Sequence, residues 1–258
     1  MITVICPTYN SENNIKECLD SVLNQTMSPD EVIISDDGSN DNTIEFLNKY
    51  KKFFLSKQIK FEIIENEHCG PGFARNMGIS KSRNKWISFL DSDDIWEEEK
   101  VECVINEIKN NNEINTILHL EKFVKIDGSV ECLDYSVFYN KNTPLTEQLF
   151  KTNFLSTSAV TIQKKLIQKY GCFDINLPNA QDYDLWLKIA PEMKLKIIPN
   201  VLGQYVEVET SITRRLYYKK IKSLLIIWYR YRKYSSIKTA MIRLFKIVFS
   251  KSWIKSFF

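Results

Sequence analysis

The feature that most limits the fold is a pair of short apolar runs with a helical pattern between them. Residues 2–6 (ITVIC) and 31–35 (EVIIS) are rich in β-branched side chains, which is typical of parallel strands buried on both faces. The segment between them places apolar residues at helical spacing: Ile15, Leu19, Val22 and Leu23. A strand, a helix and a strand in this order form a βαβ unit. The sequence therefore predicts an α/β fold that binds ligands at the carboxyl ends of its strands.

Polar loops follow four of the predicted strands. The loops are Pro7-Thr8-Tyr9-Asn10, Asp36-Asp37-Gly38-Ser39, residues 68–76 with Arg75, and Asp91-Ser92-Asp93-Asp94. Because the carboxyl ends of parallel strands meet at one edge of a sheet, we expect a shared ligand crevice there. The sequence contains neither a glycine-rich dinucleotide fingerprint nor a P-loop, so bound phosphates would be held by a metal ion and Arg75.

Three carboxylates follow the fourth strand within a single loop. The apolar run 86–90 ends at Asp91, Asp93 and Asp94. Clustered acids at the end of a buried strand raise one another's pKa values unless a cation lies among them, which favours a divalent metal site. Ligation by oxygen alone indicates magnesium or manganese rather than zinc. The alternative is an acidic turn in which one aspartate caps a helix that begins near Glu97.

Composition narrows the class of protein. The chain has 258 residues, of which 44% are hydrophobic, enough for one large α/β domain with an ordinary core. Its six cysteines are scattered without a CxxC pair and Met1 leads directly into a strand, so we expect reduced thiols in a cytoplasmic protein. His68 and His119 are the only histidines, too few for a zinc site or a Ser-His-Asp triad.

The second half of the chain has a different order of predicted strands and helices. Its expected elements are strands at 116–120 and 122–126 with a hairpin turn at Asp127-Gly128, a strand at 156–162 and a helix at 164–170. Asp182 stands where an amphipathic helix begins, and its simplest local role is an N-terminal cap. The segment 120–157 contains no motif that indicates a function, and we expect it to shape an acceptor site.

Five motifs occur in the order and spacing of a known family. They are Val4-Ile5-Cys6-Pro7-Thr8-Tyr9-Asn10, Asp36-Asp37-Gly38-Ser39, Ala74-Arg75-Asn76-Met77-Gly78, Asp91-Ser92-Asp93-Asp94 and Gln181-Asp182-Tyr183-Asp184-Leu185-Trp186. On these motifs, residues 1–213 resemble the family 2 glycosyltransferases. Any one motif is weak evidence, but five in register argue strongly against a chance match.

The resemblance implies a GT-A fold, a Rossmann-like and mainly parallel sheet flanked by helices, and sugar transfer with inversion from a nucleotide-diphosphate-sugar. A UDP-sugar is the expected donor, Mn2+ or Mg2+ the cofactor, and a hydroxyl of a glycan or lipid-linked acceptor the attacking group. Such a reaction would serve surface polysaccharide or lipopolysaccharide synthesis. The resemblance also implies a nucleotide-sugar-binding half, 1–95, and an acceptor and catalytic half, 96–213.

The nucleotide pocket that the resemblance implies lies in the first half of the chain. Its lining residues would be Pro7, Thr8, Tyr9 and Asn10. Asp36, together with Asp37, would accept a hydrogen bond from the base. Arg75 would lie against the nucleotide or its phosphates.

The resemblance also assigns the metal ligand and the base. Asp91 and Ser92 would face the ribose and the sugar, and Asp93 would ligate the metal, with Asp91 as a second candidate ligand. Asp182 would be the general base that deprotonates the acceptor.

Two departures from the family pattern affect this site. Gln181 replaces the glutamate that usually precedes the catalytic aspartate, which removes a charge beside Asp182 and is expected to lower its pKa slightly. The Arg and His that many members carry after the equivalent of Tyr205 are here Val206 and Val208. We therefore expect no third protein ligand from this segment, and expect the diphosphate and water to complete the metal shell.

Two other functions fit part of the pattern. A metal-dependent nucleotidyltransferase also gathers acids at strand ends, but it would carry a glycine-rich basic loop after its first strand, where this chain has Pro7-Thr8-Tyr9-Asn10. A non-catalytic relative would only bind sugar nucleotide, and the presence of Asp93 and Asp182 argues against it. Glycosyl transfer remains the function that we expect.

Residues 214–258 differ sharply in charge from the rest of the chain. They hold 13 of the 35 lysines and arginines and none of the 32 acidic residues. Two amphipathic helical patterns are separated by Ser235-Ser236, and the longest uncharged run in the first, 223–229, is too short to span a bilayer. We expect this tail to lie on an anionic membrane surface, at the inner face of the cell membrane. The alternatives are a helical hairpin docked on the acidic body and a nucleic-acid-binding tail, although no nucleic acid partner is expected.

Overall fold

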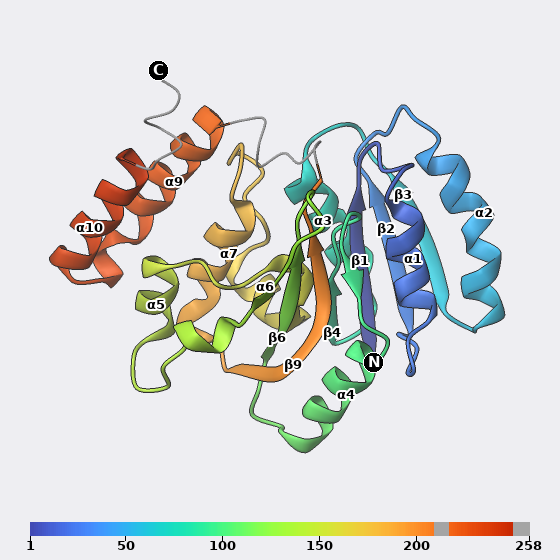
Figure 1. Cartoon of the computed structure of the whole chain (residues 1–258), viewed down its shortest axis with the longest axis horizontal. Helices are drawn as coiled ribbons and strands as arrows, with labels where there is room; N and C mark the ends of the chain where they lie inside the picture. Colours follow the sequence, from blue (N-terminus) through green and yellow to red (C-terminus); the bar gives the residue numbers. More distant parts are fainter. Residues whose placement is uncertain (209–216, 250–258) are drawn as a thin grey trace.

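The computed structural model describes residues 1–208 and 217–249. One sheet runs through the molecule in the order β3-β2-β1-β4-β8-β6-β9-β5, with β7 paired to β6 (Figure 1). Its strands are β1 (Ile2–Thr8), β2 (Glu31–Asp36), β3 (Lys60–Glu65), β4 (Trp86–Phe89), β5 (Ile95–Trp96), β6 (Thr116–Val124), β7 (Val130–Leu133), β8 (Val160–Gln163) and β9 (Leu195–Val206). The described helices are α1 (Ile15–Leu23), α2 (Thr43–Ser56), α3 (Pro71–Lys81), α4 (Lys100–Asn110), α5 (Leu145–Lys151), α6 (Lys164–Tyr170), α7 (Gln181–Ile189), α9 (Tyr217–Tyr231) and α10 (Ile237–Val248).

The first half of the sheet is parallel, as the sequence predicts. Strand β1 pairs in parallel with β2 on one side and with β4 on the other, and β2 pairs in parallel with β3. All four strands therefore end at the same edge of the sheet, and each leads into one of the four polar loops. The expected convergence of these loops is confirmed.

The second half of the sheet differs from the prediction in its strand boundaries. The two strands expected at 116–120 and 122–126 are one strand, β6, whose pairing with β9 shifts register on both sides of Leu120. A local irregularity of this kind lets a strand continue while its side-chain pattern changes. The turn at Asp127-Gly128 is present, and the strand that follows it and pairs with β6 is β7.

Two further boundaries differ from the prediction. The strand expected from residue 156 begins only at Val160, because a 3-10 turn, Thr157–Ala159, precedes β8. The helix expected near Glu97 begins at Lys100, because Ile95 and Trp96 first pair with β9 as the short strand β5.

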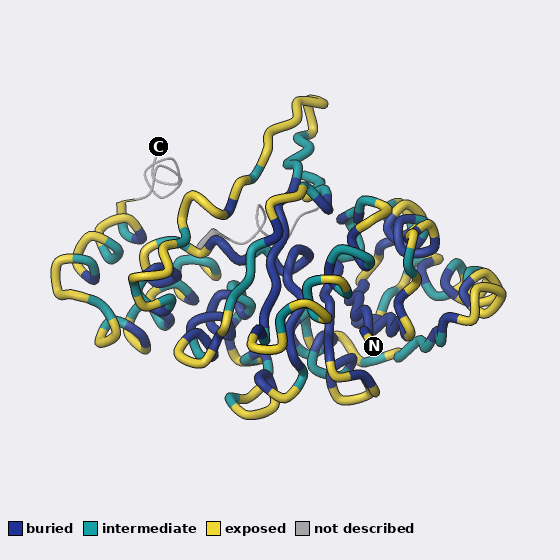
Figure 2. Tube along the Cα trace, turned by 90° about the horizontal axis from the view of Figure 1, so that it is seen from below, coloured by how far each residue is buried: buried dark blue, intermediate teal, exposed yellow. Residues whose placement is uncertain are grey.

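Alternate side chains of β1 face two separate apolar layers. Val4 and Cys6 pack with α1, α2 and α4, whereas Ile5 packs with α3, α6 and α7 on the other face. Figure 2 shows the buried central strands between more exposed helices. This double coverage explains why the strand has no polar alternation. All six cysteines are unpaired.

Helices α9 and α10 form a hairpin at the end of the molecule opposite α2 (Figure 1). Ile227, Tyr231 and Ala240 from this hairpin belong to the same apolar core as α7. Within the described residues, no helix has the length and apolar character needed to cross a bilayer. The predicted boundary at residue 213 lies within 209–216, outside the described residues.

Candidate active site

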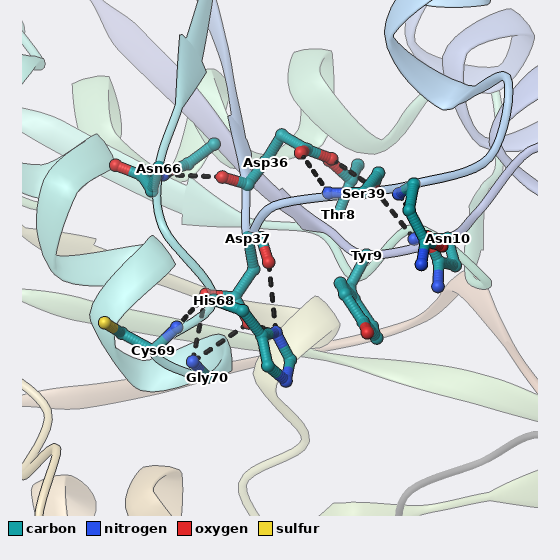
Figure 3. Close-up of polar contacts among 12 residues, drawn as sticks. Thr8, Tyr9, Asn10, Asp36, Asp37, Ser39, Asn66, His68, Cys69 and Gly70 are labelled. Atoms are coloured by element: carbon teal, nitrogen blue, oxygen red, sulfur yellow. Dashed lines mark hydrogen bonds and ion pairs between the residues drawn. The ribbon is translucent and has the colours of Figure 1, made fainter.

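Asp36 ties together the loops that follow β1 and β2 (Figure 3). Its Oδ1 accepts hydrogen bonds from the hydroxyls of Thr8 and Ser39, at 2.9 and 2.5 Å, and its Oδ2 accepts the Ser39 amide at 2.8 Å. Asn10, at a left-handed φ of 48°, adds its own amide to Ser39 Oγ at 2.8 Å and accepts the Asn40 amide at 2.9 Å. Because a carboxylate oxygen can accept two hydrogen bonds, these contacts leave one acceptor position on Asp36 Oδ2.

Asp37 anchors the loop that follows β3. Its Oδ1 accepts the amides of Cys69 and Gly70, each at 2.9 Å, and its Oδ2 lies 2.9 Å from Nδ1 of His68. The His68 ring stacks on Tyr9 with centroids 4.3 Å apart (Figure 3). The exposed Tyr9 and His68 rings thus lie on the loops that Asp36 and Asp37 hold together. The sequence showed His68 only as an isolated histidine, and its place in a strand-end loop was the one signal that it belongs to this edge.

Arg75, on α3, joins the acidic loop to the rest of the site. Its Nη2 lies 2.5 Å from Oδ1 of Asp91, and its guanidinium lies 5.5 Å from the centre of the Phe173 ring. Burial opposes the charge of Arg75, but the carboxylates of Asp91, Asp182 and Asp93 outweigh it and raise the Arg75 pKa. Its buried Nε has no hydrogen-bond partner in the described part of the chain. The Arg75 guanidinium therefore lies near the carboxylates of Asp91, Asp93 and Asp182, and its Nε–H has no acceptor among the described residues.

Ser158 and Val206 fix the acidic loop through hydrogen bonds to Asp91 and Asp94. The Ser158 hydroxyl donates to Oδ2 of Asp94 and accepts the amide of Asp91 at 3.0 Å, and Oδ1 of Asp94 accepts the Val206 amide at 3.1 Å. Burial, and after it the charges of Asp93 and Asp91, holds the pKa of Asp94 well above its usual range. Asp94 thus braces the loop against the end of β9. No motif in the sequence indicated the part played by Ser158.

Asp93 is the remaining carboxylate of the acidic loop. Burial and the charge of Asp91 raise its pKa to about 6. Among residues 1–208 and 217–249, no three His, Cys, Asp or Glu side chains converge on a metal position. The residues present therefore fit a cation bound by one or two carboxylates and completed by substrate oxygens and water, as Mg2+ often is. Ser92, beside them, shares a hydrogen bond of 2.9 Å with Ser11.

Asp182 lies in the first turn of α7, partly buried. The cap position is Ala180, at a left-handed φ of 56°, so the cap that the local sequence suggested for Asp182 is wrong. Burial raises the pKa of the Asp182 carboxyl, and the charge of Arg75 opposes that rise. A raised pKa makes the Asp182 carboxylate a stronger base than an exposed aspartate.

Gln181 brings the start of α7 against the start of α3. Its Nε2 donates to the carbonyl of Leu177 at 2.8 Å, and a β-carbon placed on Gly72 would come within 2.5 Å of its Oε1. The missing side chain at Gly72 therefore allows the two helices to approach. This contact joins the helix of Arg75 to the helix of Asp182.

Helix α9 is tied to the same end of α7. Arg230 Nη1 lies 2.9 Å from Oδ1 of Asp184 and 2.8 Å from Oδ2 of Asp174, and the Tyr231 hydroxyl lies 3.2 Å from Asp184 Oδ1. Asp184 is fully buried, so Arg230 compensates a buried charge two residues beyond Asp182. The inner face of α9 is thus docked on the body, which is the arrangement considered as an alternative for the tail.

Residues 3–170 match the sequence profile of the family described as Glycosyl transferase family 2. The match covers well over half of the sequence, and the chain belongs to this family. Chondroitin synthase of Pasteurella multocida is 30% identical over 196 residues, which are 76% of this chain and 19% of that protein. The chain spans between 27% and 58% of the lengths of three other curated relatives.

Two solved structures share the fold. S. aureus TarS 1–349 in complex with UDP-GlcNAc superposes with a TM-score of 0.73 at 21% identity, covering 99% of this chain and 74% of that one. A mannosyltransferase of Pyrobaculum calidifontis in complex with GDP-Man and Mn2+ has a TM-score of 0.69 at 18% identity, covering 98% of this chain and 71% of that one. These likenesses confirm the predicted GT-A fold.

Proposed function

We propose that this chain transfers a sugar, with inversion, from a nucleotide-diphosphate-sugar to a hydroxyl of a glycan or lipid-linked acceptor. The observation that carries the proposal is the position of Arg75, which pairs with Asp91 at 2.5 Å and whose pKa the charges of Asp93 and Asp182 also raise. A cation among carboxylates at the carboxyl edge of parallel strands suits a ligand that joins an anionic diphosphate to a neutral sugar. Membership of glycosyltransferase family 2 supports the same reaction class.

The donor in this proposal is a UDP-sugar. Its base would lie on the exposed ring of Tyr9, beside Thr8, and a base N–H would use the remaining acceptor position on Asp36 Oδ2. Asp37 and Asn10 would hold the loops around the base, because their side chains already accept protein amides. The complex of TarS with UDP-GlcNAc supports this class of donor.

Mn2+ or Mg2+ is the cofactor in this proposal. Asp93 would hold the ion, with Asp91 as a second candidate ligand, and the ion would neutralise charge on the leaving diphosphate. Arg75 would share that task, because its buried Nε is a donor without a partner among the described residues. Ser92 would face the ribose. The complex of the mannosyltransferase with Mn2+ supports this choice of ion.

Asp182 is the general base in this proposal. The acceptor hydroxyl would give its proton to the Asp182 carboxylate while its oxygen attacks the anomeric carbon, and the nucleoside diphosphate would leave from the opposite face. The configuration at that carbon would invert in one step, without a covalent sugar intermediate. A positioned base of this kind typically accelerates a reaction roughly 10²- to 10⁴-fold.

The acceptor in this proposal is a glycan or a lipid-linked sugar at the cell membrane. Similarity to a chondroitin synthase supports a role in polysaccharide synthesis, here of a surface polysaccharide or lipopolysaccharide. A lipid-linked acceptor would bring the protein to the inner face of the cell membrane. The excess of Lys and Arg after residue 213 would attract anionic lipid there.

The released products test the proposal. The protein is incubated with UDP-sugars and GDP-sugars, with Mn2+ or with EDTA, and we expect metal-dependent release of a nucleoside diphosphate. A nucleotidyltransferase would instead form a nucleoside triphosphate from the donor and added pyrophosphate. A non-catalytic relative would bind the donor without releasing any product. Either of these two outcomes overturns the proposal, and Asp127→Asn in the exposed hairpin turn serves as a control variant.

A further inference from the structure

The outward side of α10 exposes a row of large apolar side chains. Ile237 is 85% exposed and Phe245 is 62% exposed, and Met241 lies between them at four-residue spacing on the helix. Phe249, also exposed, continues the row beyond the last turn. Side chains four residues apart lie on one face of a helix, so these four residues form a continuous strip. Contiguous exposed apolar surface of this kind usually marks an interaction site.

The opposite side of α10 is already used to dock the hairpin. Ala240 and Ile247 are buried there, and the indole N–H of Trp228 donates to the Ala240 carbonyl at 2.8 Å. Arg243 donates to the carbonyl of Lys151 on α5 at 3.3 Å. The helix therefore has two apolar sides, of which one packs on the protein and the other faces outward.

A hollow of about 460 Å3 lies at the elbow between α9 and α10. Its walls combine Arg232, Lys233 and Ser235 with Ile237 and Met241, the first two members of the exposed row. Guanidinium, ammonium and hydroxyl groups are the donors that bind phosphate, whereas the other wall is apolar. Such a site suits a small anionic headgroup that is attached to an apolar chain.

We propose that this surface docks on an anionic phospholipid bilayer. The apolar row Ile237, Met241, Phe245 and Phe249 enters the interface, and the hollow beside Arg232 takes a headgroup phosphate. Residues 217–249 contain no Asp or Glu, and Lys238 and Lys246 are exposed on the same helix, so the whole surface is attracted to negative lipid. The inference deepens the membrane location in the proposed function, but vesicle binding requires no sugar transfer.

Other occupants suit this surface less well. A second copy of the chain would bring two basic surfaces without acids face to face, and their like charges would repel. Nucleic acid would be attracted to the basic side chains but would leave the aliphatic and aromatic row without an apolar partner. A bilayer supplies both negative charge and an apolar interior.

Vesicle sedimentation tests the proposal with the full 258-residue chain. Binding is measured on phosphatidylcholine vesicles and on vesicles that also contain phosphatidylglycerol, at low and at high salt. We expect binding to the anionic vesicles that weakens as salt rises. Met241→Glu combined with Phe245→Glu should lower the partition coefficient more than roughly tenfold. Arg232→Gln combined with Lys233→Gln should lower it about fivefold per cation, and only on anionic vesicles.

The matched control lies on α2, at the other end of the molecule. Phe53→Glu combined with Leu55→Glu changes two exposed apolar residues to the same acids, and it should leave binding unchanged. Thermal unfolding by circular dichroism checks that each variant is folded, and Met241→Ser with Phe245→Ser replaces the glutamate pair if that pair unfolds. No binding of the wild type to anionic vesicles at low salt overturns the proposal. Vesicle binding that is reduced neither by the Met241 and Phe245 changes nor by the Arg232 and Lys233 changes also overturns it. So does the finding that the chain binds no vesicles but forms a dimer that the Met241 and Phe245 changes dissociate.

Discussion

The guanidinium of Arg75 lies 2.5 Å from the carboxylate of Asp91, and this ion pair connects α3 to the acidic loop after β4. The charge of Asp182, on α7, raises the pKa of Arg75, and the charge of Arg75 in turn lowers the pKa of Asp182. The same cation therefore couples the candidate donor site to the candidate base. The relationship makes the ionisation of Asp182 depend on a residue more than a hundred positions earlier in the sequence.

Arg75→Met is expected to move the acidic limb of the activity profile to higher pH. Burial raises the pKa of Asp182 and Arg75 opposes that rise, so loss of the cation raises the pKa further. Asp182 accepts a proton only in its ionised form, and activity is therefore lost at a higher pH in the variant than in the wild type. The measurement is the pH dependence of kcat/KM. Arg83→Met, which changes an exposed arginine, is the control, and a limb that stays in place or moves to lower pH contradicts the coupling.

Ser158→Ala is expected to weaken metal-dependent donor binding. The change leaves the buried Oδ2 of Asp94 without this donor and the Asp91 amide without this acceptor, so the acidic loop loses its support. Loss of such supporting contacts typically costs about 10- to 100-fold in metal affinity, and an unsatisfied buried group costs about 1–3 kcal/mol of stability. Calorimetric titration with Mn2+ and donor measures the effect. Ser136→Ala, at an exposed serine, is the control, and an equal loss of donor affinity in EDTA would remove the metal from this explanation.

Arg230→Met is expected to destabilise the protein through Asp184. Removal of the cation from a buried pair usually costs about 3–5 kcal/mol, but the Arg230 side chain is 39% exposed and solvent screens the pair, so we expect about 1–3 kcal/mol. Urea unfolding gives the free energy of unfolding. Adding Asp184→Asn should recover part of the loss, because the buried charge, which without Arg230 has only Lys188 3.6 Å away, is then removed. Arg232→Met on the same hairpin is the comparison, and an equal loss in both single variants would contradict a specific role for Arg230.

The parallel half of the fold could be predicted because each of its signals is local. The apolar runs 2–6 and 31–35 are buried on both faces. A βαβ connection makes the two strands parallel, so the polar loops that follow them lie at the same edge of the sheet. The extent of β6 could not be predicted in the same way. Its continuity through residue 121 depends on pairing with β9, which lies about 80 residues later in the sequence.

The residues of the site could be predicted from the sequence motifs, but the separate role of each residue could not. Asp93 and Asp94 are adjacent and chemically identical, yet the hydrogen bonds that Asp94 makes to Ser158 and Val206 give it a structural role. That difference arises from β8 and β9, which the acidic motif itself does not describe. The pairing of Arg230 with Asp184 also joins distant parts of the sequence. The charge pattern of the tail alone could not distinguish docking on the body from contact with a membrane.

The role of Asp182 as the general base is the central claim, and Asp182→Asn tests it most directly. Ala180 occupies the cap position of α7, so the amide neither removes a cap nor changes the shape of the side chain, and the fold should be retained. Donor affinity, measured by calorimetry, should persist, while the single-turnover transfer rate should fall roughly 10²-fold or more because the amide cannot accept a proton. A variant that binds donor normally and transfers sugar within a few-fold of the wild-type rate would contradict the claim and exclude Asp182 from the reaction.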